Sequence, residues 1–91
     1  MADSDACYLA YRGGRVDDAE AICNRGLAEA RCANATQVEG MLYFSLGLCA
    51  EARPDWRSAK RDYESSLEVR PGNDKVQERL GAVTTRLTEP P

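Results

Sequence analysis

The stretch GMLYFSLGLCAEARPDWRSAKRDYESSLEVRPGN, residues 40–73, decides the fold of this chain. Pro54 divides it into two helix-length segments, and Pro71, which has no amide hydrogen, ends the second of them. Bulky and small residues recur along it at helical spacing: Tyr43, Leu46, Gly47, Ala50, Ala59 and Tyr63. We therefore expect a hairpin of two helices that cross closely at Gly47 and Ala59, with the bulky side chains on either side.

Turn-forming residues divide the rest of the chain into further helices. Gly13-Gly14 separates two segments ahead of this stretch, and Pro90-Pro91 follows the last segment. Helices are expected at about residues 3–12, 16–31, 36–52, 56–70 and 74–87. No window alternates with the two-residue period of a half-buried strand, so the expected fold class is all-α.

Polar residues at the start of three of these helices fit the pattern of N-terminal caps. Thr36 and Glu39 stand three residues apart, the spacing of a capping box in which both side chains bond free amides at the helix start. Asp55 is the expected cap of the next helix, and Asn73 or Asp74 is the expected cap of the last.

The spacing within residues 40–73 resembles the tetratricopeptide repeat, a unit of about 34 residues with the pattern W-x2-L-G-x2-Y, then A-x3-F, then P. Tyr43 stands for the Trp, Ala50 for the first Tyr and Tyr63 for the Phe. The resemblance implies antiparallel helix hairpins that stack as a short right-handed superhelix.

The resemblance implies two further units, which together with residues 40–73 would make a single tetratricopeptide-like domain over residues 1–91. Residues 1–33 form a degenerate repeat, in which Gly14, Ala19 and Gly26-Leu27 match the family but several bulky positions do not. Leu80-Gly81 lies 34 residues after Leu46-Gly47, and residues 74–88 resemble the single helix that covers the end of such arrays.

The resemblance also implies a function, because repeats of this family bind partners on the concave side lined by the first helix of each unit. Its groove positions fall here on Tyr8, Tyr11, Met41, Phe44, Leu48, Lys75 and Arg79. We expect this groove to bind an apolar peptide or helix of a partner protein, with Phe44 as the central anchor, in an adaptor or chaperone-like role. The alternative is that Met41, Phe44 and Leu48 are core residues, or pack on a second copy in a self-associating scaffold or a longer repeat array.

A third function concerns Lys75 and Arg79, which lie four residues apart. Tetratricopeptide domains that hold the acidic C-terminal tails of chaperones carry a Lys and an Arg at these two places. The same clamp needs one more Lys and two Asn, where this chain has Ser4, Tyr8 and Ser45. An ordinary charged helix face explains the two basic residues equally well.

Composition argues against several other classes of protein. The net charge is −3 with acidic and basic residues interleaved, so no nucleic-acid-binding face is expected. The chain has no His, the commonest general base near neutral pH, and no nucleophile or phosphate-loop motif, so we do not expect an enzyme.

The N-terminal residues and the cysteines suggest the compartment. The first residues are polar and acidic, and no apolar run is long enough to span a membrane, so a cytoplasmic protein is expected. Cys7, Cys23, Cys32 and Cys49 are then expected to be free thiols. Their gaps of 16, 9 and 17 residues lack the paired spacing of a zinc site, so neither a metal nor another cofactor is expected.

Overall fold

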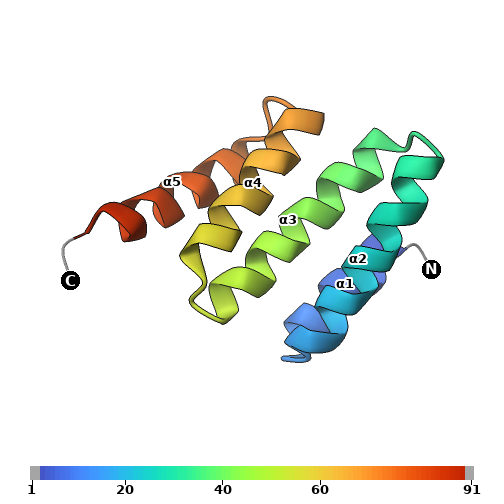
Figure 1. Cartoon of the computed structure of the whole chain (residues 1–91), viewed down its shortest axis with the longest axis horizontal. Helices are drawn as coiled ribbons and strands as arrows, with labels where there is room; N and C mark the ends of the chain where they lie inside the picture. Colours follow the sequence, from blue (N-terminus) through green and yellow to red (C-terminus); the bar gives the residue numbers. More distant parts are fainter. Residues whose placement is uncertain (1–2, 90–91) are drawn as a thin grey trace.

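The computed structural model describes residues 3–89, and side chains from Asp5 onward. Within this range the chain forms helices only: α1 (Asp3–Arg12), α2 (Val16–Cys32), α3 (Thr36–Ala52), α4 (Trp56–Val69) and α5 (Asp74–Thr88) (Figure 1). The all-α prediction is confirmed, and each predicted helix is found with ends that differ by one residue at most.

Short connections make consecutive helices run in opposite directions, as Figure 1 shows. Gly14 and Gly72 adopt positive φ angles of 81° and 85° in two of these connections, a conformation that glycine reaches without steric cost. Each helix packs on the next one along the chain, and α1 also packs on α3. The first and third helices therefore lie next to each other although α2 separates them in the sequence.

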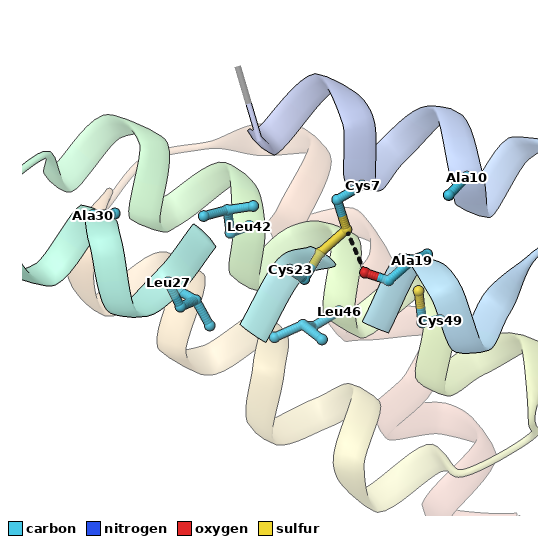
Figure 2. Packing of buried hydrophobic residues seen from close by; sticks show 9 residues of the cluster. All are labelled: Cys7, Ala10, Ala19, Cys23, Leu27, Ala30, Leu42, Leu46 and Cys49. Atoms are coloured by element: carbon cyan, nitrogen blue, oxygen red, sulfur yellow. Dashed lines mark hydrogen bonds between the residues drawn. A yellow bond between two sulfur atoms is a disulfide. The ribbon is translucent and has the colours of Figure 1, made fainter. Parts of the chain in front are cut away.

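The buried side chains form two clusters that meet at α3. The first cluster joins α1, α2 and the middle of α3 and is drawn in Figure 2; the second joins α3, α4 and α5 around Tyr63. Every residue from Ser45 to Ala50 is buried. Such burial explains why this helix is apolar on more than one side, because it packs on a neighbour on each flank.

The crossing of α3 and α4 occurs at Gly47, as expected, but its closest neighbour differs from the prediction. A Cβ atom added at Gly47 would lie 2.6 Å from Cδ1 of Tyr63, closer than atoms can approach without a shift. Ala59, the predicted neighbour, is fully buried one turn earlier on α4. The ring of Tyr63 thus occupies the space that the missing side chain leaves.

The prediction of four free thiols is wrong for two of the cysteines. Cys7 on α1 and Cys23 on α2 form a disulfide, with their Cα atoms 5.5 Å apart. The two residues face each other across the first hairpin, and this separation lies within the range that a disulfide spans. Cys32 is exposed and Cys49 is buried, and both are free.

The helix starts confirm two predicted caps and correct one. The Asp55 carboxylate accepts a hydrogen bond from the Ser58 amide at 3.2 Å, and Asn73 Oδ1 accepts from the amides of Lys75 and Val76 at 3.1 and 3.4 Å. The capping box predicted at Thr36 and Glu39 is wrong, because α3 has Ala35 as its N-cap and no side-chain cap bond.

The side chains of Thr36 and Glu39 do not cap α3. Thr36 is already the first residue inside the helix, so its hydroxyl stands one position too late to cap it. The Glu39 carboxylate lies 3.5 Å from Nε of Arg31 on α2. Glu39 therefore helps to join two helices and does not bond back to the start of its own helix.

Candidate functional site

A groove with a volume of about 270 Å³ opens between α1, α3 and the start of α5. Its lining residues come from all three elements: Asp5, Tyr8, Gly40, Met41, Phe44, Ser45, Asn73, Lys75 and Val76. Four of the seven residues predicted from the sequence are among them, namely Tyr8, Met41, Phe44 and Lys75. The structure does not bring Tyr11, Leu48 or Arg79 to this lining.

Two large apolar side chains of the groove are exposed. Tyr8 on α1 is 38% exposed and Met41 on α3 is 40% exposed. Only two other large apolar side chains in the described part of the chain are comparably open, namely Leu9, which lines a separate hollow between α1 and α2, and Leu87 near the end of α5. Because both side chains line one hollow, an apolar group of another molecule placed there would contact both of them.

Phe44 belongs both to the groove and to the core. It lines the hollow, yet it is half-buried and packs on the second cluster, with its ring centroid 5.8 Å from that of Tyr63. The two interpretations of Phe44 from the sequence are therefore compatible. Leu48, one turn further along α3, is only 7% exposed and lies in the core.

Arg79 does not face the groove because its guanidinium is engaged elsewhere. Its Nε and Nη2 donate to Oε2 of Glu51 at 3.1 and 2.8 Å, and the hydroxyl of Tyr63 donates to the same oxygen. Burial, and then the contact with Glu51, raises the pKa of Tyr63 above its ordinary value. This network joins α3, α4 and α5.

The remaining predicted residues lie at the edges of the site. Tyr11 is half-buried against the first cluster, with its ring centroid 6.2 Å from that of Tyr8, so it stands behind the α1 wall. Lys75 is exposed on the α5 side, and Asp5 is exposed on the α1 side. The rim therefore carries one charge of each sign. Of the chaperone-tail positions, the side chain of Ser4 lies outside those described.

Several lining residues were not named from the sequence. Gly40 ends the groove on α3, where its carbonyl accepts a hydrogen bond at 2.8 Å from the buried Ser66 hydroxyl of α4. Helical spacing would have found two of the others: Asp5 lies three residues before Tyr8, and Ser45 lies four residues after Met41.

Neither similarity to known proteins nor, among the described residues, a recognisable metal-binding cluster or membrane-spanning helix assigns a ligand to this groove. Comparisons of the chain with protein-family models, with curated protein sequences and with solved structures found no match. Within residues 3–89, no three His, Cys, Asp or Glu side chains are grouped so that they could hold a metal ion. None of the helices there has both the length and the apolar composition that a membrane span requires.

Proposed function

We propose that this chain is a tetratricopeptide-type module that binds an apolar peptide or helix of a partner protein in the groove between α1, α3 and α5. The order of the helices supports the assignment, because α1, α3 and α5 are the first helices of the three units expected from the repeat spacing. Residues from all three line one hollow, as the inner helices of such a stack would.

The observation that carries the proposal is the pair of exposed side chains, Tyr8 and Met41, on two walls of the groove above Phe44. Aromatic and Met side chains are enriched in the cores of protein interfaces, where a polar rim surrounds them. Asp5 and Lys75 provide such a rim here. Covering Tyr8 and Met41 with an apolar partner would remove the largest exposed apolar surface of the groove from water.

The volume of the groove favours a peptide over a small metabolite. Sites for drug-sized molecules enclose about 300–1,000 Å³ and bury most of the ligand. At about 270 Å³ and open to solvent, this groove fits one or two side chains of a longer segment. Such binding would suit an adaptor or a chaperone-like holder, roles that need no catalytic step.

The two alternative functions use different parts of the same surface. Binding of an acidic C-terminal tail has weaker support, because Arg79 is paired with Glu51 and only Lys75 remains available at the groove. Self-association, or stacking in a longer array, would cover Tyr8 and Met41 with a second copy or a further repeat. Light scattering across a range of protein concentrations separates self-association from binding of a different protein.

Affinity measurements with matched variants test the proposal. Peptides selected from a displayed random library on the immobilised chain would be labelled, and their Kd measured by fluorescence anisotropy. We expect Met41→Lys to weaken binding by about tenfold or more, because it places a charge in an apolar contact. The control is Leu9→Lys, which charges an apolar side chain that is 54% exposed but lies outside the groove. Equal affinities for both variants, or no loss with Met41→Lys, would contradict the proposal.

A further inference from the structure

The disulfide between Cys7 and Cys23 ties the wall of the groove to the rest of the molecule. In Figure 2, Cys7 reaches down from α1 to Cys23 on α2, and both residues are fully buried. Asp5 and Tyr8, the two residues that α1 contributes to the groove, lie two positions before Cys7 and one position after it. A bond that holds Cys7 in position therefore also holds Asp5 and Tyr8 at the groove.

Helix α1 is short, and few of its large side chains contact the core. It has 10 residues, fewer than the roughly 12–15 that an isolated helix needs to be even marginally stable in water. Of its described side chains, only Cys7 and Ala10 are buried, and both are small. Tyr11 is the one large α1 side chain packed against the first cluster in the described part of the chain, and it is only half-buried. Loss of the covalent tie would therefore leave α1 held mainly by Tyr11 and two small buried residues.

The core accommodates the thiol form of the pair as well as the disulfide. The Cys7 sulfur lies 3.1 Å from the carbonyl oxygen of Ala19, as the dashed line in Figure 2 marks. A thiol at Cys7 donates its hydrogen to this oxygen, whereas a disulfide sulfur has no hydrogen to donate. Reduction therefore does not leave the Cys7 thiol without a partner inside the core.

Exchange between the two forms requires α1 to move. A thiolate must approach the sulfur that it attacks, and neither sulfur can be reached from solvent while α1 covers α2. Oxidation by a small disulfide such as oxidised glutathione converts the Cys7 and Cys23 thiols to one disulfide and releases two molecules of reduced glutathione. Two electrons and two protons pass from the protein to the glutathione, so the step is balanced.

We propose that the Cys7–Cys23 pair is a reversible redox switch that sets the order of α1 and thereby the affinity of the groove for its partner. The proposal rests on the groove function above. In the reducing cytoplasm expected from the sequence the pair is in its thiol form, α1 is loosely held and the groove lacks one wall for part of the time. Oxidation ties α1 down and completes the groove.

The test is a redox titration of the chain carrying Cys32→Ser, which removes the exposed thiol and so prevents cross-linking between molecules. The chain is equilibrated in glutathione buffers of increasing oxidised fraction. We expect oxidation to raise the melting temperature by about 10–20 °C, as closing a loop of this length does in a small domain. Amide hydrogen exchange in α1 should slow by about tenfold or more, with a smaller change in α4 and α5.

The groove itself is followed by the ¹³C-methyl resonance of Met41, which lies beside Phe44 and Tyr8 and needs no partner for its detection. We expect this resonance to shift on oxidation and to return on reduction. Cys7→Ser keeps a hydrogen-bond donor near the carbonyl group of Ala19 but cannot form a disulfide with Cys23. This variant should therefore match the reduced chain in every buffer. Unchanged α1 exchange and an unchanged Met41 resonance across the titration would overturn the proposal, as would a disulfide that glutathione never reduces under native conditions.

These measurements separate the switch from the groove function. If no peptide binds, the melting temperature, the exchange rates and the Met41 resonance still report on the switch. If peptides bind with the same Kd to the oxidised and reduced chains, the groove stands and the regulation is refuted. We expect oxidation to strengthen peptide binding by about tenfold, because pre-ordering a binding surface removes part of the entropy cost of association.

Discussion

At the scale of single residues, two glycines that each follow a Leu, 34 residues apart, have opposite surroundings. Gly47 on α3 faces the ring of Tyr63, so an added Cβ would collide with it. At Gly81 on α5 no atom lies within 4 Å of the place where a Cβ would stand. The glycine is thus at a close contact where α4 packs on α3, and at an open surface on α5.

Alanine at these two glycines should change stability in opposite directions. Gly47→Ala should lower the free energy of unfolding by about 1–3 kcal/mol, because the buried ring of Tyr63 must shift to make room. Gly81→Ala should raise it by about 1 kcal/mol, since alanine restricts the unfolded chain and favours the helix. Urea unfolding followed by circular dichroism measures both. A change of the same sign at both positions would contradict the helix crossing described here.

Asp62 on α4 carries a carboxyl group whose pKa is raised from 3.8 to about 6. Burial is the largest cause, nearby Glu20 and Asp55 add to the rise, and Arg61 opposes it. The folded state therefore binds the proton more tightly than the unfolded chain. Between about pH 4 and pH 6 the free energy of unfolding should fall as the pH rises. The stabilisation that comes from the protonated Asp62 carboxyl group should be fully lost at neutral pH.

Asp62→Asn removes this ionisation and should stabilise the protein at pH 7 by up to about 3 kcal/mol. At pH 3, where both states hold the proton, the same substitution should have little effect. Denaturant unfolding at the two pH values measures the difference. Glu64→Gln is the control, because Glu64 is half exposed on the same helix and is not among the charges that raise the pKa of Asp62. An equal gain at both pH values would refute the role of burial at Asp62.

At the scale of helices, α5 is attached through polar as well as apolar contacts. The mostly buried Glu51 carboxylate of α3 accepts hydrogen bonds from Tyr63 of α4 and Arg79 of α5. Removing the carboxylate leaves a buried hydroxyl and a guanidinium without their shared partner. Buried polar groups that lose a partner cost more than the hydrogen bond itself contributes.

Glu51→Ala should therefore lower the free energy of unfolding by about 1–3 kcal/mol and speed hydrogen exchange in α5 more than in α2. Glu64→Ala provides the comparison, because Glu64 is half exposed and its ion pair among residues 5–89 is with Lys60 on its own helix. Such surface pairs contribute about 0.3–0.5 kcal/mol. Similar losses from both variants, with α5 exchange unchanged, would mean that the network does not hold α5.

The bounds of the helices could be predicted from the sequence because Gly and Pro mark the breaks between them. Contacts between side chains of different helices could not, because they depend on how the helices pack. The Asp55 and Asn73 caps were predictable, since each directly precedes a helix after a clear break. The pattern at Thr36 failed because the helix includes that residue. The Cys7–Cys23 bond was missed because a gap of 16 residues says nothing until the two helices are known to face each other at that level.

At the scale of the whole molecule, the seven predicted site residues divide according to where the groove ends. Tyr8, Met41, Phe44 and Lys75 lie at the end where α1, α3 and the start of α5 meet. Leu48 shares a face of α3 with Phe44, but that part of the helix is buried. Spacing along one helix predicted which residues share a face, and only the positions of the other helices could decide how far along that face the groove extends.

Chemical-shift mapping of a selected peptide on the ¹⁵N-labelled chain is the most direct test of the groove as a binding surface. We expect the amides that shift to cluster in three segments, residues 5–8, 40–45 and 73–76, which lie far apart in sequence and line one hollow in the structure. The shifts should saturate with the Kd measured by anisotropy. Shifts confined to the outer faces of α2 and α4, with these three segments unchanged, would contradict binding in the groove.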